Sequence, residues 1–154
     1  MCAHNGTHID APYHFLDDGK TVDMMTLTTT VGYAYVAQHS GDMTASDAKD
    51  ILSRAKACPS SPSKILIKGV STITADAACV FADAGIHLIG VESQTVGPEH
   101  APAQVHRILL SKGVALLEGI RLSEVCQGEY FLCAAPINLS GADGAPCRAL
   151  LIEK

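Results

Sequence analysis

Apolar residues along the chain fall into short runs, some with the spacing of strands and others with the spacing of helices. Runs rich in β-branched, aliphatic and aromatic residues predict strands. These strands are expected over 28–38, 64–70, 87–92, 114–119, 129–135 and 147–153. Helices are expected between them, over 44–55, 75–84 and 103–112. Strands and helices interleave in the middle of the chain, whereas both ends are mainly β, which predicts an α/β or α+β domain with a mixed sheet.

The predicted helices have recognisable ends. Thr44 opens the stretch TASD, a start of the capping-box type, and Thr74 stands before ADAACVFADA as an N-cap. Pro102 suits the first turn of the third helix, where a missing backbone N–H does no harm. Gly85 and Gly113 stand where a helix ends in the left-handed conformation. These signals set the helix limits independently of the apolar pattern.

Length and charge limit the classes of protein. The 154 residues predict one domain over 1–154. The net charge is −5 and Lys and Arg form no cluster, which argues against nucleic acid and anionic membranes as partners. No apolar run approaches the roughly 18 residues of a spanning helix, and signal-peptide features are absent, so a cytoplasmic location is expected.

The six cysteines bear on the same question. None forms a CxxC pair, and several lie in apolar surroundings, such as Cys79 in AACVFA and Cys133 in FLCAA. They are expected to be reduced and mostly buried thiols of a cytosolic protein. A disulfide framework is the alternative.

The segment HNGTHIDAPYHF concentrates candidate metal ligands. Its polar candidates are His4, His8, Asp10 and His14. In a helix, at ~100° per residue, Asp10 would point about 200° away from His8. In extended chain all four occupy even positions and face one side, and Gly6 and Pro12 would bend the segment so that the side chains converge. Imidazoles with a carboxylate and no thiolate suit Zn²⁺, Mn²⁺ or a similar divalent ion.

Further ligands are expected from the second half of the chain. His106 lies inside the helical stretch AQVHRILLSK, and Glu118 ends the apolar strand VALLE twelve residues later. A carboxylate after such a run needs a partner. The spacing alone leaves open whether either residue binds metal. The histidines expected to be surface or satisfied structural residues are His39, His87 and His100.

Three motifs resemble one family. HNGTHIDAPYHF resembles the signature HxGTHxDxPxHF of the cyclase family of metal-dependent hydrolases, which includes kynurenine formamidases and isatin hydrolases. HRILLSKGVALLEGI resembles the family's His…Glu stretch, and GADGAPCRALLIE resembles its C-terminal GxDGxPxRA segment. The resemblance runs from His4 to the end of the chain.

The resemblance implies two divalent metal ions, zinc or manganese. His4, His8 and Asp10 would bind one of them. Asp10 and Glu118 would bridge to the second, which His106 would also bind. The implied fold is a swivelling β/β/α domain with a twisted, barrel-like β core flanked by helices. The implied assembly is a homo-oligomer, a dimer or a tetramer.

The resemblance also implies an activity, hydrolysis of a C–N amide bond in a small molecule. A metal lowers the pKa of bound water toward ~7, and His14 would accept and return the proton as the catalytic residue. The expected substrate is an N-formylated arylamine of the N-formylkynurenine type, as for an arylformamidase. The alternative substrate is a cyclic amide of the isatin type. Contacts with the substrate cannot be assigned from the sequence.

Two departures from the family pattern change this picture. Family members carry a few dozen residues before the histidine motif, whereas this chain starts three residues before His4 and contains no Trp. The sequence is therefore expected to be N-terminally incomplete. Many relatives have an aspartate where this chain has Glu92, which is expected only to orient nearby groups. The competing hypothesis is a truncated, non-catalytic member that binds metal or forms oligomers.

Overall fold

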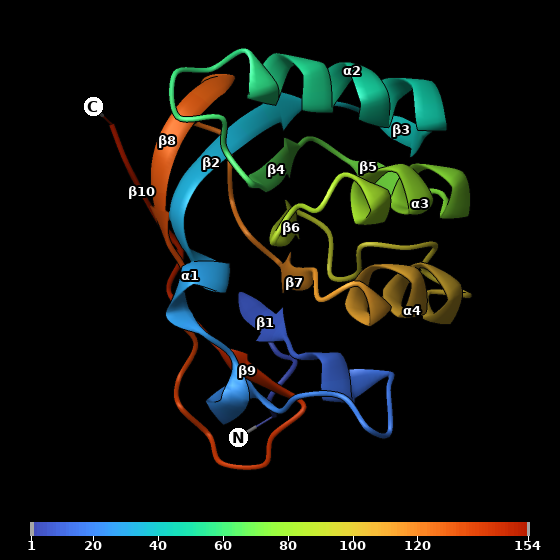
Figure 1. Ribbon diagram of the computed structural model, residues 1–154, viewed down its shortest axis with the longest axis vertical. Helices are drawn as coiled ribbons and strands as arrows, with labels where there is room; N and C mark the ends of the chain where they lie inside the picture. The colour runs from blue at the N-terminus through green and yellow to red at the C-terminus, as the bar shows by residue number, and fades with distance from the viewer. Residues whose placement is uncertain (1, 154) are drawn as a thin grey trace.

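A computed structural model describes residues 2–153 as an eight-stranded mixed sheet, curled into a half-barrel, with helices along one face (Figure 1). The strand order is β10-β8-β2-β4-β6-β7-β1-β9. The strands are β1 (His8–Asp10), β2 (Val31–Gln38), β4 (Lys64–Lys68), β6 (Leu88–Val91), β7 (Ala115–Glu118), β8 (Gly128–Cys133), β9 (Gly144–Pro146) and β10 (Leu150–Ile152). The central strands β2, β4, β6 and β7 are parallel, and the flanking strands pair antiparallel. The predicted mixed sheet is confirmed.

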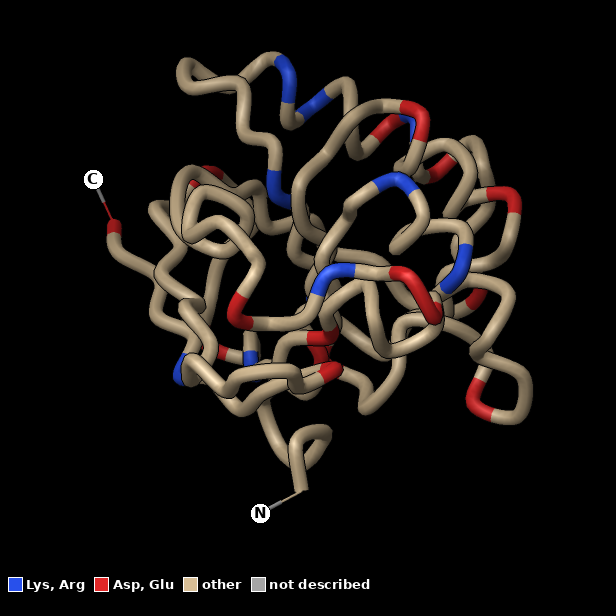
Figure 2. The backbone as a smooth tube through the Cα atoms, turned by 60° about the horizontal axis from the view of Figure 1, so that its bottom comes forward, with Lys and Arg blue, Asp and Glu red and all other residues tan. Residues whose placement is uncertain are grey.

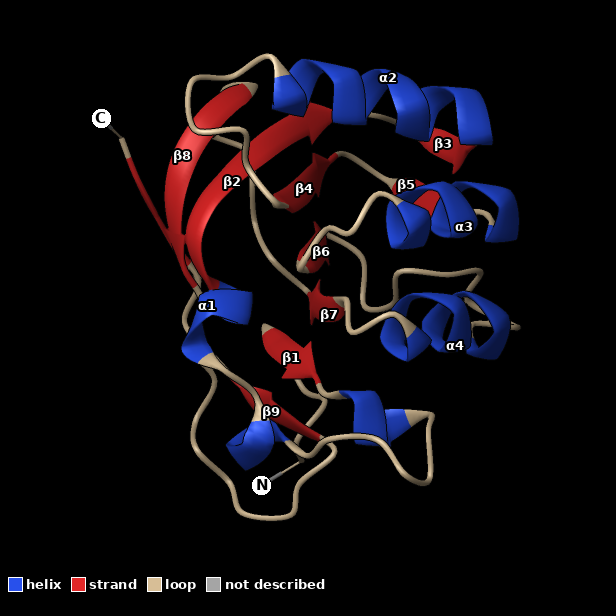
Figure 3. Ribbon diagram, viewed as in Figure 1, coloured by secondary structure: helices blue, strands red, loops and turns tan. Residues whose placement is uncertain are grey.

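Three helices cover one face of the sheet (Figure 3). They are α2 (Ala45–Lys56), α3 (Ala75–Asp83) and α4 (Ala103–Ser111). The shorter elements are α1 (Leu27–Thr30), the 3-10 turns at Pro12–His14 and Val22–Met24, and a separate pair of parallel strands, β3 (Gly41–Met43) and β5 (Ser71–Ile73). The helices stand beside one another, so their apolar sides and the sheet enclose a common core (Figure 1).

Strand alternation divides the apolar residues between two cores. Ile65 and Ile67 of β4 pack toward the helices, while Leu66 between them belongs to a second cluster on the concave face. The same division occurs in β7, where Leu116 faces the helices and Leu117 the concave side. Because both faces of the central strands are covered, these strands appear in the sequence as continuous apolar runs.

The helix limits follow the predicted caps. The Thr44 hydroxyl accepts a hydrogen bond from Asp47 N while the Asp47 carboxylate accepts one from Thr44 N, a complete capping box. The Thr74 hydroxyl caps α3 by accepting a hydrogen bond from Ala77 N. One prediction was wrong. Residues 28–30 belong to the short helix α1 rather than to the strand, which starts at Val31.

The prediction of mostly buried cysteines was also wrong. All six are free thiols, but Cys2, Cys79 and Cys126 are exposed, and the other three are partly buried. Cys79 shows why the apolar surroundings misled. It lies on α3, whose buried side is formed by its helical neighbours Ala78 and Phe81, so its own side chain points outward.

Charge is spread over the fold without a basic face. Lys and Arg residues are scattered over several elements, with Asp and Glu residues among them (Figure 2). Across the described residues, none of the helices has the length and apolar character needed to span a bilayer.

Candidate metal centre

Strand β1 places two predicted ligands on the helix side of the sheet. It pairs with β7 so that His8 lies opposite Glu118, and His8 Nε2 is 3.5 Å from Glu118 Oε2 and 3.3 Å from Asp10 Oδ1. Ile9 points to the opposite face and packs in the concave core. All three polar side chains are at least 97% buried. Alternation along β1 and its pairing with β7 thus bring a histidine and two carboxylates together in a buried contact.

Helix α4, in the layer that covers the sheet, contributes His106 to this cluster. Its Nε2 is 3.2 Å from Glu118 Oε1 and 3.5 Å from Asp10 Oδ2. The other ring nitrogen, Nδ1, donates a hydrogen bond to the carbonyl of Pro102, at 2.9 Å. In the same way His8 Nδ1 donates to the Gly6 carbonyl, at 2.9 Å. Each backbone contact fixes the tautomer and aims Nε2 at the carboxylates, as is usual for histidines that bind metal.

Turns on both sides of β1 bring the remaining two histidines back to the same place. Gly6 adopts φ +68° before the strand, and Pro12 starts a 3-10 turn after it. As a result, the rings of His4 and His14 stack with centroids 4.0 Å apart, and His4 Nδ1 lies 2.8 Å from Asp10 Oδ1. The segment converges through two turns around a three-residue strand, rather than as one bent strand over its whole length.

The donor set fits a divalent metal. Two groups have ligand atoms within 4.8 Å of one another, one of His8, Asp10 and Glu118 and one of His4, Asp10 and His14. Asp10 belongs to both groups. His4 Nε2 and Asp10 Oδ2 are buried and have no hydrogen-bond partner among the described residues. Buried polar atoms without partners are unfavourable in a protein and are what a bound cation would satisfy.

Charge at the site is concentrated on Asp10. Burial alone would raise the pKa of its carboxyl, but contacts with His106, His4 and His8 hold that pKa well below its usual range. The hydrogen bond to Asp10 raises the pKa of His4 to about 9. Burial lowers the pKa of His106, and its contacts with Asp10 and Glu118 overcome this effect and raise it to about 9. A metal ion bound at these rings would have to displace their protons.

These shifts predict how the stability of the metal-free protein depends on pH. Because the folded protein binds protons at His4 and His106 more tightly than the unfolded chain does, their contribution is complete below pH 6.5 and is lost as the pH rises to about 9. We expect the free energy of unfolding, measured by denaturant titration after chelation, to fall over this window by on the order of 3 kcal/mol. The substitution His106→Gln should remove a large part of the fall, whereas His87→Gln should not. A flat profile for the unmodified chain would contradict the assigned contacts.

Backbone N–H groups in loops hydrogen-bond two carboxylates at the ends of β6 and β7, Glu92 and Glu118. Val96 N donates a hydrogen bond to Glu118 Oε1, at 2.9 Å. The two carboxylate oxygens of Glu92 accept hydrogen bonds from Gly69 N and Leu122 N, each at 2.7 Å. Glu92 thus ties together the loops that follow β4, β6 and β7. Its expected orienting role stays a prediction.

Asp143 was noted in the sequence only as part of a motif, yet it reaches the site. Its Oδ2 lies 3.0 Å from His14 Nδ1 and 3.0 Å from His4 Nε2. The contact with His14 joins residues 129 positions apart. Local patterns carry no signal for such a contact, and only the GxDGxPxRA resemblance drew notice to this segment.

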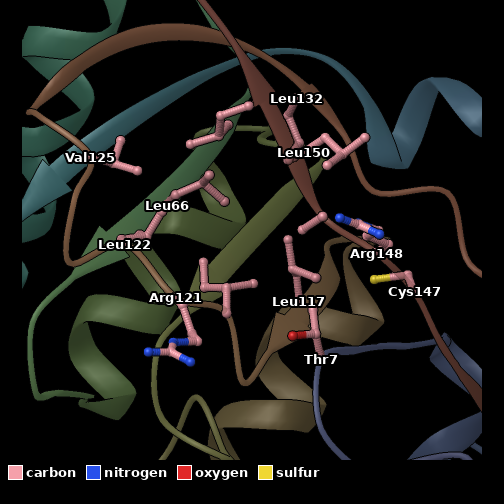
Figure 4. A pocket seen from close by; sticks show the side chains of 13 residues that line it. Thr7, Leu66, Leu117, Arg121, Leu122, Val125, Leu132, Cys147, Arg148 and Leu150 are labelled. Carbon is pink, nitrogen blue, oxygen red and sulfur yellow. The ribbon is translucent and has the colours of Figure 1, made fainter.

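The site opens to solvent through a hollow of about 270 Å³. Its walls include His4 and His14, each about three-quarters buried, together with Gln94, Thr95 and Pro102. A larger cavity, about 410 Å³, lies on the concave face and is lined mainly by aliphatic side chains, with two arginines, Arg121 and Arg148 (Figure 4). That cavity contains none of the predicted ligands, so the polar chemistry of the molecule belongs to the smaller hollow.

Known proteins share both sequence and fold with this chain. The family described as "Putative cyclase" matches residues 1–98. The kynurenine formamidase of Salinibacter ruber is 32% identical over 163 residues, which cover 98% of this chain and 76% of that protein. This chain belongs to the cyclase family. The kynurenine formamidase of Bacillus mycoides is 34% identical, with coverage of 98% and 77%.

Solved structures of the cyclase family have the same architecture. A potential metal-dependent hydrolase with cyclase activity superposes with a TM-score of 0.84 at 31% identity, covering 98% of this chain and 79% of the other. An isatin hydrolase bound to thioisatinate gives a TM-score of 0.85 at 18% identity, with coverage of 100% and 74%, and supports the fold alone. The family resemblance and its assignment to the metal-dependent hydrolases are confirmed, and the family fold is the predicted one.

Proposed function

We propose that this chain hydrolyses the C–N bond of a small N-aryl formamide of the N-formylkynurenine type. The main support for the proposal is one cluster of six side chains, in which five line the hollow, namely His4, His8, His14, His106 and Glu118, and Asp10 lies buried behind them in contact with His4, His8 and His106. The sequence relatives named above as kynurenine formamidases support the substrate class. An amide of this kind needs an activated water and a proton for the departing nitrogen, and the hollow offers groups suited to both tasks.

Within this proposal, the metal ligands come from the cluster of side chains around Asp10. His4, His8 and Asp10 would hold one zinc or manganese ion, and Asp10, His106 and Glu118 would hold a second. Asp10 would be the shared ligand, because its two oxygens face different histidines. When bound, such an ion supplies a nucleophilic water at neutral pH and polarises the amide carbonyl. Residues Val96, Pro102 and Gly6 orient the ligands through their backbone groups.

His14 is the proton-transfer residue in this proposal. It lies at the mouth of the hollow, one quarter exposed, where substrate and water have access. Its imidazole takes a proton as the water oxygen bonds to the carbonyl carbon, and it returns that proton to the nitrogen as the C–N bond breaks. The products are a carboxylic acid and an amine.

The experiment is a hydrolysis assay with two substrates and two metals. We expect the protein loaded with Zn²⁺ or Mn²⁺ to release formate from N-formylkynurenine, and to turn over isatin more slowly. Faster hydrolysis of isatin than of N-formylkynurenine would contradict the proposed substrate class and favour a cyclic amide instead. No turnover of either substrate by protein that binds metal would favour a non-catalytic metal-binding protein.

We also propose that the chain forms one domain that works in the cytoplasm as a homodimer or tetramer. Six free thiols suit a reducing compartment. The edge strand β10 exposes Leu150 and Ile152, which suits burial against another subunit. Sedimentation velocity tests the assembly, and a monomer at micromolar concentration would contradict it.

A further inference from the structure

Asp143 touches both partly exposed histidines of the site but forms a hydrogen bond with only one. His14 Nδ1 donates to Asp143 Oδ2, at 3.0 Å. His4 Nε2 lies equally close to that oxygen but makes no hydrogen bond with it. The directed interaction of Asp143 is therefore with His14.

The backbone around Asp143 is built to hold this carboxylate in place. Ala11 N donates a hydrogen bond to the Asp143 carbonyl, at 2.9 Å, and the next residue starts β9, which pairs with β1. That next residue is Gly144, and a Cβ there would lie 2.5 Å from His4 Cε1 and 2.9 Å from the Ile9 carbonyl oxygen. Only glycine allows the strand to approach so closely, and the approach brings the carboxylate of Asp143 to the histidine.

The His14 ring is held on its remaining sides as well. It stacks on His4, with centroids 4.0 Å apart, and meets the ring of Phe15 edge-on at 4.6 Å. Over residues 2–153, His14 Nε2 makes no hydrogen bond. A neutral imidazole carries one N–H, so a proton kept at Nδ1 by Asp143 leaves the lone pair on Nε2.

We propose that Asp143 is the positioning residue of His14, keeping the proton on Nδ1 so that Nε2 serves as the proton acceptor. The inference rests on the proposed function, because it assigns Nε2 the proton transfer described there. Water bonds through oxygen to the carbonyl carbon and gives one proton to Nε2. When the C–N bond breaks, its electron pair stays on nitrogen, which takes that proton from Nε2. The Asp143 carboxylate stays ionised throughout, and no further reactant is needed.

The first test reads the tautomer directly. Long-range ¹H–¹⁵N spectra of the Zn²⁺-loaded and the metal-stripped protein, at a pH where the ring is neutral, identify His14 by comparison with His14→Ala. We expect the Nδ1–H form in the unmodified chain and a shift toward the Nε2–H form in Asp143→Ala. An Nε2–H tautomer in the unmodified chain, or an unchanged spectrum in the variant, would overturn the inference.

The second test separates positioning from a structural role. We expect Asp143→Ala to lower kcat about a hundredfold, with KM and metal content close to those of the unmodified chain. Asp143→Asn keeps the shape of the side chain, but its amide N–H favours the opposite tautomer, so it should be no better than alanine. A purely structural contact would instead leave Asp143→Asn nearly fully active.

Asp23 provides the matched control. Its carboxylate holds the same loop by accepting hydrogen bonds from Gly141 N and the Ser140 hydroxyl, each at 3.1 Å, without touching a site histidine. Asp23→Asn should keep kcat within about threefold. Equal losses in Asp23→Asn and Asp143→Ala, or loss of metal in Asp143→Ala, would overturn the inference. If the unmodified chain hydrolyses no amide, the proposed function fails, and the tautomer comparison still decides the role of Asp143.

Discussion

Replacing His14 with alanine is expected to lower kcat by about a thousandfold while metal content stays unchanged. The reason is the place of the ring. It lies at the mouth of the hollow, where substrate and water have access, and its Nε2 makes no hydrogen bond with the described residues. General acid–base catalysis by one positioned side chain is typically worth a hundredfold to ten-thousandfold. Steady-state kinetics and elemental analysis on the same preparation measure both quantities.

His87 provides the control for the His14→Ala variant. His87 pairs with the Ser63 hydroxyl far from the predicted ligands, so His87→Ala should keep both activity and metal. The ligand atoms of His14 lie within 4.8 Å of those of His4 and Asp10. If His14→Ala loses metal together with activity, His14 is a ligand and the proton must be moved by another group.

Replacing Asp10 with asparagine is expected to abolish metal binding as well as activity. Asp10 is 99% buried, and its oxygens lie 2.8 Å from His4 Nδ1, 3.3 Å from His8 Nε2 and 3.5 Å from His106 Nε2. Asparagine keeps the volume but removes the charge and one acceptor oxygen. Metal affinity should fall at least about a hundredfold, since even changes in the groups that support metal ligands cost tenfold to a hundredfold.

Thermal unfolding with and without metal measures this loss independently of any substrate. A metal that binds only the folded chain raises the melting temperature in proportion to the logarithm of its concentration over Kd. The unmodified chain and the surface control Asp83→Asn should show this rise, because Asp83 is exposed and its carboxylate pairs with the exposed Lys112. Asp10→Asn should not. A rise equal to that of the unmodified chain would remove Asp10 from the ligand set.

Local sequence signals predicted the parts of the fold that depend on local chemistry. The caps at Thr44 and Thr74 start helices because a side-chain oxygen satisfies a free N–H nearby in the chain. Strands β3, β5 and β9, of three residues each, were not predicted. Three residues are too few to show an alternating pattern, and their pairing depends on segments distant in sequence.

Some residues of the candidate site could likewise be predicted from local sequence, whereas others could not. His4, His8, Asp10 and His14 stand within eleven residues, so their clustering is visible in the sequence, and the buried carboxylate of Glu118 stands out because it ends an apolar run. The family motif was needed to make His106 a firm candidate. The roles of these residues stay predictions. The supporting contacts arise between loops that only folding brings together, and no pattern within one segment could have indicated them.

The pairing of β1 with both β7 and β9 has a consequence for the order of events during folding. The first histidines of the chain reach their partners only after residues 118 and 143–146 have been made and have closed on β1. Contacts of such long sequence separation form late, because the chain must lose much conformational freedom before they exist. A metal ion held by the proposed ligands would therefore find all of them together only in an almost finished fold. It follows that added metal should slow unfolding strongly and leave the rate of folding nearly unchanged.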